Sequence, residues 1–281
     1  MGGGIEGGTS HRPFFPLRSR LNLFNEGYFM NPFESHEIAH LSASTCNMFA
    51  SSPAMFVLTK VLKRPNVVGA AAHRGTAVED GISAGLTDQS LDPLQCAGIA
   101  LDKFKMLTAL SGDSRLEKEQ AAVPEMVKQG LQALRPYGVP SSMQGEIRYE
   151  INGLAVPFIG YYDFEWDNGQ RKILIDLKTT HALHSEISNA HARQLALYHA
   201  ARGGESDPQI AYVTPKKHAI YRLENPSAHV KALLQIGLSI QKFLSITKDP
   251  GELASLVVPD VDSFYFADPL TRKAAFDVWG V

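Results

Sequence analysis

The segment 143–179 constrains the fold more than any other part of the sequence, because it has the pattern of three consecutive strands. QGEIRYEI alternates polar and apolar residues, which is the period of a strand with one buried face. Asn152-Gly153 is a hairpin turn signal, and LAVPFIGYYDFEW continues in extended form. A second turn signal at 167–169 precedes the largely apolar KILIDLKTT. We therefore predict a three-stranded antiparallel meander.

The sequence on both sides of this meander has mainly helical patterns. Apolar residues recur there at helical spacing, Ser42 or Ser44 is expected to cap the first helix, and Pro53 is expected to start a second one running through MFVLTKVLKR. Further helices are expected at 71–86, 91–110, 114–134, 187–201, 227–246 and 269–278, and short strands at 209–214 and 219–223. This order predicts an α/β fold, with a central mixed β-sheet flanked by helices and elaborated by further helices.

The composition is that of a globular protein. Of 281 residues, 44% are hydrophobic and 20% are charged, which is enough to bury one sizeable core. We predict a flexible N-terminal arm at 1–30, rich in glycine and proline, and a single domain at 31–281 with a helical insertion at about 88–136. No apolar run of about 18 residues is present, so no membrane contact is predicted.

Cysteine content and charge exclude some classes of protein and leave others open. Cys46 and Cys96 are the only cysteines, too few for a four-cysteine metal site or a disulfide framework. We predict buried thiols in a reducing compartment, the cytoplasm of a bacterium or a phage-infected cell. The net charge of -2 neither supports nor excludes a nucleic-acid partner, because phosphate attraction acts within about 8 to 10 Å.

Two aspartates and a lysine are expected to meet on the second hairpin of the meander. Asp163 and Asp176 lie at comparable distances from the turn at 167–169, so the two strands bring them together. Asp176 and Lys178 are two residues apart and share a face of their strand. Carboxylates are hard ligands for Mg²⁺ or Mn²⁺, and an ammonium can orient water or neutralise a phosphate. Phosphodiester hydrolysis is therefore one reading of this group.

A salt-bridged hairpin on a solvated face is the alternative reading of this group. Apolar residues flank Asp176 in ILIDLK, and a carboxylate in such a buried strand requires a partner or a metal. On the helix that follows, Gln194 and Tyr198 are four residues apart and share a face, where they could bind a nucleotide strand. Thr179 and Thr180 follow Lys178 with hydroxyls suited to phosphate.

The order G-x-x-D, I-D-x-K-T and Q-x-x-x-Y resembles the PD-(D/E)XK nuclease superfamily, in particular its RecB-like and lambda-exonuclease-like branch. An upstream helix in that branch carries G-x-x-x-E, which is similar to Gly75 and Glu79 here. The early HLSASTCNMFASSPAMFVL is similar to the family's L-S-x-S helix. The resemblance extends from about Leu41 to Leu223 and implies a restriction-endonuclease-like core.

The resemblance implies a Mg²⁺- or Mn²⁺-dependent deoxyribonuclease and assigns roles to the residues of its motifs. The implied metal ligands are Glu79, Asp163, Asp176 and the Leu177 carbonyl; Lys178 completes the catalytic set; and the expected DNA contacts are Gln194, Tyr198, Thr179, Thr180 and Arg74. The late cysteines of iron–sulfur relatives are missing, so no cluster is expected. A Walker A sequence is missing too, so no built-in helicase motor is expected.

The activity expected from this resemblance is a DNA exonuclease acting in recombination, repair or phage replication, with a DNA end or single strand in the site. A recombination or replication protein and a second copy of the chain are further expected partners. Two alternatives remain open at this point. One is a structure-specific or restriction-type endonuclease, and the other is a non-hydrolytic DNA-binding or assembly subunit.

Overall fold

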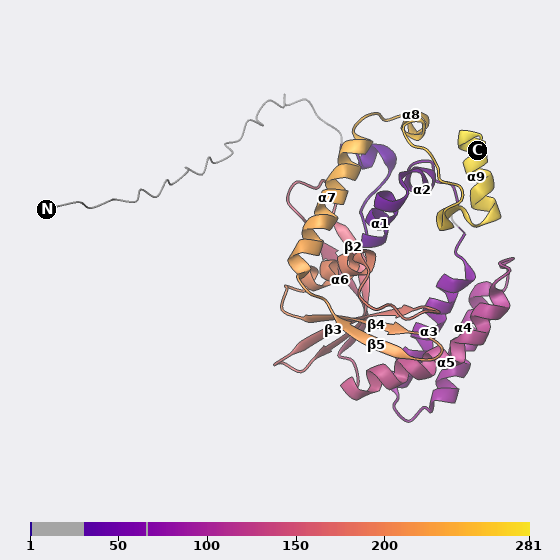
Figure 1. Cartoon of the computed structure of the whole chain (residues 1–281), viewed down its shortest axis with the longest axis vertical. Coiled ribbons are helices and arrows are strands. Elements are labelled where there is room, and N and C mark those ends of the chain that lie inside the picture. Colours follow the sequence, from indigo (N-terminus) through magenta and orange to yellow (C-terminus); the bar gives the residue numbers. More distant parts are fainter. Residues whose placement is uncertain (2–30, 66) are drawn as a thin grey trace. The chain divides into compact units, whose positions relative to one another are not determined.

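A five-stranded sheet forms the centre of the unit Asn31–Val281 (Figure 1). The computed structural model describes Met1, residues 31–65 and residues 67–281. The arm predicted at 1–30 therefore lies outside the described residues, apart from Met1. The strands are β1 (Ser142–Tyr149), β2 (Phe158–Asp167), β3 (Lys172–Thr179), β4 (Asp207–Val213) and β5 (His218–Arg222).

The strands lie side by side in chain order. β1, β2 and β3 pair in antiparallel fashion, so the predicted meander is confirmed. β3 pairs with β4 in parallel and β4 with β5 in antiparallel fashion. A parallel neighbour requires a crossover connection, which α6 (Asn189–Ala201) supplies. The mixed sheet with flanking helices confirms the predicted α/β fold class.

The remaining helices begin largely at the capping signals of the sequence. Ser42 caps the first helix by accepting a hydrogen bond from the Thr45 N–H, and Ser52 caps the second, in which Pro53 occupies the first turn. These helices are α1 (Ala43–Ser51), α2 (Pro53–Phe56), α3 (Ala70–Thr87), α4 (Pro93–Thr108), α5 (Leu116–Leu134), α7 (Pro226–Leu244), α8 (Pro250–Ser255) and α9 (Pro269–Trp279).

Two features depart from the sequence expectation. The helix predicted from Pro53 through MFVLTKVLKR is α-helical only to Phe56 and continues as a π-helical segment, Val57–Val61, closed by the Leu62 N–H on the Val57 carbonyl. The short helix α8 has no counterpart among the helices expected from the sequence, although Asp249 caps it. It spans less than two turns, which is too short to show a helical spacing of apolar residues in the sequence.

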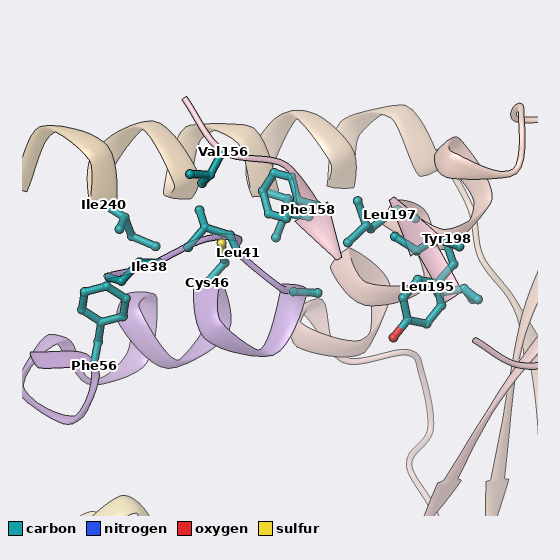
Figure 2. Close-up of a cluster of buried hydrophobic side chains, with 14 of the residues drawn as sticks. Ile38, Leu41, Cys46, Phe56, Val156, Phe158, Leu195, Leu197, Tyr198 and Ile240 are labelled. Atoms are coloured by element: carbon teal, nitrogen blue, oxygen red, sulfur yellow. The ribbon is translucent and has the colours of Figure 1, made fainter. Parts of the chain in front are cut away.

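Helices cover both faces of the sheet and bury two apolar clusters (Figure 1). On one face, side chains of α1, α6 and α7 meet β2, as Figure 2 shows for Cys46, Phe158 and Leu195. On the other face, α3 and α5 contact the sheet and α4 packs against these two helices, all within one buried cluster that includes Phe104 and Val127. α4 and α5 fall within the segment predicted as a helical insertion.

Both cysteines are free and buried, and burial raises the pKa of the Cys46 thiol to about 12. Within the described ranges, no helix has the length and apolar character needed to cross a lipid bilayer.

Candidate active site

The candidate residues Asp163 and Asp176 fall in one row across the sheet, together with Gln144 of β1. The β1–β2 register pairs Met143 with Phe164 and Gly145 with Tyr162, so its interpolation sets Gln144 opposite Asp163. The β2–β3 ladder ends at the pair Phe164–Ile175, and its next step sets Asp163 opposite Asp176. The pair Gln144–Asp163 is absent from the β1–β2 ladder, and the pair Asp163–Asp176 is absent from the β2–β3 ladder. The antiparallel part of the sheet therefore opens where the polar residues lie.

The side chain of Asp163 bonds to β3 where the ladder stops. Its Oδ2 accepts a hydrogen bond of 2.6 Å from the Leu177 N–H. The carboxylate thus satisfies a donor that an antiparallel backbone partner would otherwise take. The sequence-predicted ligand at Leu177 is the carbonyl oxygen, and that role remains a prediction.

Asp176 and Lys178 form an ion pair on β3, with the carboxylate buried and the lysine side chain partly exposed. Lys178 Nζ lies 2.6 Å from Asp176 Oδ2, and the Asp176 side chain is only 1% exposed. Burial opposes the charged form of Lys178, but Asp176 and Asp163 together outweigh it, so the pKa of Lys178 is raised and the ammonium persists. Asp176 Oδ1 has no hydrogen-bond partner among the described residues. A buried carboxylate oxygen without a donor is unusual in a purely structural ion pair.

Neighbouring carboxylates destabilise one another's charged forms at this site. Burial and the charges of Asp176 and Glu79 raise the pKa of Asp163 well above its usual range. Burial also raises the pKa of Glu79, with Asp176 adding to the effect and a hydrogen bond from Gln144 opposing it. That bond joins Gln144 Nε2 to Glu79 Oε1 at 3.0 Å. A cation placed among the carboxylates would relieve this repulsion.

The donor set suits a divalent cation, although no complete cage is formed. All three acidic side chains offer oxygen ligands, which hard ions such as Mg²⁺ prefer. Among the residues that the structure describes, no three histidine, cysteine or acidic side chains are arranged to hold a metal ion. The side chains of Asp163 and Asp176 are instead turned to the Leu177 N–H and to Lys178. The chemistry of the residues therefore fits a metal, while closure of the ligand set requires side-chain movement.

Gln194 and Tyr198 of α6 lie beside these carboxylates. Gln194 Nε2 donates a hydrogen bond of 2.6 Å to the Tyr198 hydroxyl. The Tyr198 ring belongs to the apolar cluster of Figure 2 and is 4% exposed. Burial and the Asp176 charge raise the pKa of Tyr198, so its hydroxyl stays protonated. The ring is packed in the core, which leaves the hydroxyl end rather than the ring face for any contact with DNA.

The glycine of G-x-x-D makes room for Tyr198. A Cβ atom on Gly160 would lie 2.7 Å from Tyr198 Cε1. We expect Gly160→Ala to displace the ring and to lower the free energy of unfolding by about 1–3 kcal/mol, the usual effect of overpacking. The matched control is Gly75→Ala, whose Cβ would lie 3.5 Å from Thr179 Oγ1, an ordinary contact. Urea unfolding of the two variants measures the difference, and equal stabilities would contradict the packing argument.

Arg74, a sequence-predicted DNA contact, lies with its side chain buried. Arg74 Nη1 is paired with Glu119 Oε2 from α5, and Nη2 donates to the Thr179 carbonyl at 3.2 Å. His181 Nε2 lies 2.9 Å from the same Glu119 oxygen. Protein groups occupy this guanidinium and join α3, α5 and the end of β3, and the contact of Arg74 with DNA remains a prediction.

The two threonines after Lys178 differ in their surroundings. Thr179 Oγ1 accepts a hydrogen bond of 3.3 Å from Arg74, whereas Thr180 Oγ1 donates to the Ala182 carbonyl at 3.0 Å. Both side chains are half-buried. Their proposed contact with phosphate requires these local bonds to be shared or exchanged.

Gln144 and Glu119 are site neighbours that sequence reasoning missed. Gln144 belongs to an alternating strand and Glu119 to an amphipathic helix, so neither stands out by residue type. For Glu119 the only sequence signal is its place in the apolar period of α5, where it is 3% exposed. For Gln144 the sequence contains no signal, and only its backbone conformation in the structure marks it.

Comparison with known proteins establishes the family. The family model of the PD-(D/E)XK nuclease superfamily matches residues 40–272, and the chain belongs to this superfamily. The match confirms the superfamily predicted from the motifs, while the RecB-like and lambda-exonuclease-like branch remains a prediction. Members of the superfamily are nucleases and generally use divalent metal ions.

Comparison with solved structures and with curated proteins adds little. The solved structure "Crystal structure of SSO0001" is 17% identical to this chain, and the match covers 69% of this chain and 89% of that chain. Its TM-score of 0.31 is too low to support conclusions about this chain. A search of curated proteins gives no match.

Proposed function

We propose that this chain is a DNA exonuclease that requires Mg²⁺ or Mn²⁺. The observation that carries the proposal is the group of buried Asp176 with half-buried Asp163 and Lys178 at the point where the β2–β3 ladder opens. Glu79 of α3 adds a third carboxylate whose raised pKa reflects burial and the nearby Asp176. Such a group is costly in a folded protein unless a cation or a substrate uses it.

Each residue has a distinct proposed role. Asp163, Asp176 and Glu79 would hold the ion, with the Leu177 carbonyl as a further ligand. When bound, the ion would supply polarisation of the scissile phosphate and a water of lowered pKa. Lys178 remains an ammonium beside Asp176, where it orients the attacking water and offsets negative charge on the phosphate.

The DNA contacts are proposed from α6 and from the end of β3. Gln194 presents an amide next to the Tyr198 hydroxyl, and the pair would meet the strand near the cleaved bond. Thr179 and Thr180 would bind a neighbouring phosphate through their hydroxyls. A recombination or replication protein and a second copy of the chain remain proposed partners.

A DNA-topology assay tests the exonuclease proposal. We expect the protein to degrade linear DNA with Mg²⁺ or Mn²⁺ and to leave covalently closed duplex circles and circular single strands intact, because an exonuclease needs an end. EDTA is expected to stop the reaction. The measurement is nucleotide release and gel mobility with linear and circular forms of the same sequence.

The matched control is Lys178→Ala, which is expected to leave linear DNA intact. Degradation of the circles would replace the exonuclease by a structure-specific or restriction-type endonuclease. Binding of DNA with no cleavage in either metal would favour the non-hydrolytic assembly subunit.

A further inference from the structure

Gln144 has a backbone conformation that is out of place in a strand. Its φ is 50°, in the left-handed region that residues with a Cβ rarely adopt. The other three such residues in the described ranges are Glu37, Lys63 and Asn225. Glu37 and Lys63 follow the C-terminal ends of helical segments, where the conformation is common. Asn225 directly precedes α7, and asparagine adopts this conformation more readily than most residues. Gln144 alone among the four lies inside a strand.

This conformation falls in the row that contains the candidate metal ligands. Gln144 is opposite Asp163, the β1–β2 pairing omits both, and the ladder resumes at Gly145 with Tyr162. A Cβ on Gly145 would overlap the Tyr162 ring, so this ring lies directly against β1 at the residue after Gln144. The departure is therefore confined to one residue, and it redirects a single side chain.

The redirected side chain donates a hydrogen bond to Glu79 of α3. Gln144 Nε2 donates to Glu79 Oε1 at 3.0 Å across a separation of 65 residues. The next residue on α3, Asp80, pairs instead with Lys103 of α4 at 3.0 Å. Of these two adjacent acids, Asp80 forms an ion pair between α3 and α4, whereas Glu79 is hydrogen-bonded to Gln144 of the sheet. A donor on Oε1 leaves the other oxygen of Glu79 available to a ligand.

We propose that Gln144 is a positioning residue that fixes the Glu79 carboxylate beside Asp163 and Asp176. Backbone strain at functional sites persists where the surrounding structure imposes it, and outer hydrogen bonds orient metal ligands in many proteins. The inference rests on the proposed function, because it takes Glu79 as a ligand. It adds β1 to the elements that build the site.

The test is Mn²⁺ binding to the DNA-free full chain, measured by titration calorimetry and by the Mn²⁺ spin-resonance signal. Gln144→Met keeps the length of the side chain and removes the donor. We expect it to weaken Mn²⁺ binding by about 10-fold, within the range typical of outer-sphere partners. Gln144→Gly relieves the backbone strain, and we expect it to weaken binding equally without loss of thermal stability. Gln235→Met on α7 is the matched control and is expected to bind as wild type does.

A double-mutant cycle separates positioning from a general structural effect. In a Glu79→Ala background, Gln144→Met is expected to change Mn²⁺ affinity by less than about twofold, because its partner is gone. A loss of the same size in both backgrounds would overturn the proposal, as would wild-type affinity in Gln144→Met. If wild type binds no Mn²⁺ and cleaves no DNA, the proposed function falls and this inference with it. If wild type binds Mn²⁺ and Gln144→Met binds it with the same affinity, only the role of Gln144 is contradicted and the proposed function stands.

Discussion

Asp176→Ala is expected to lower the rate of DNA cleavage by about 10³-fold or more. The carboxylate is the most buried acid of the site, and Oδ1 has no hydrogen-bond partner among the described residues. As the proposed metal ligand, Asp176 would contribute several kcal/mol to charge stabilisation on the phosphate, and each 1.36 kcal/mol corresponds to about a tenfold change in rate. The measurement is single-turnover cleavage of labelled linear DNA at saturating Mg²⁺.

The fold is expected to survive this substitution. Asp176→Ala removes one of the mutually repelling carboxylates, and Lys178 retains Asp163 as a negative neighbour. Circular dichroism and the unfolding midpoint would establish that the loss of activity is chemical. Active sites are often less stable than their disabled variants for this reason.

Asp167→Asn is the matched control on the same hairpin. Asp167 accepts the Gly169 N–H in the turn, a bond that an asparagine oxygen also accepts. Cleavage by this variant is expected to stay close to that of wild type. Undiminished cleavage by Asp176→Ala would show that Asp176 is not part of the site.

The meander and the Asp163–Asp176 alignment could be predicted because both depend on local chemistry. Turn residues at 167–169 fix the hairpin, and the hairpin register then sets which residues face each other. The structure places Asp163 one step past the last pair, opposite Asp176. Counting residues from the turn does not predict that the β2–β3 ladder ends at Phe164–Ile175. The hydrogen bond from the Leu177 N–H to the Asp163 side chain, which replaces the next backbone bond, has no sequence signature.

Residues whose roles depend on distant partners could not be predicted. Arg74 is next to the G-x-x-x-E motif, and its charge suits DNA and a buried acid equally well. The packing of α5 against α3 brings Glu119 to this guanidinium, and no local sequence pattern announces that contact. Gln144 is harder still, because neither its type nor its neighbours favour a left-handed conformation.

Glu119→Ala is expected to lower the free energy of unfolding by about 3–5 kcal/mol, the usual loss when one member of a buried ion pair is removed. The Arg74 and Glu119 side chains are 5% and 4% exposed, so the variant would leave a guanidinium buried without its counter-charge. His181 would lose the same oxygen. Urea or thermal unfolding followed by circular dichroism measures the change.

Glu125→Ala on the same helix is the matched control. Its partner Lys128 lies 3.8 Å away, and both side chains are about half exposed, so we expect a loss below about 1 kcal/mol. A second comparison uses the pair Arg74→Met with Glu119→Leu. Because apolar replacement of a whole buried ion pair is often neutral or stabilising, we expect this double variant to recover most of the stability lost in Glu119→Ala. If Glu119→Ala is no less stable than Glu125→Ala, the pair does not hold α3 to α5.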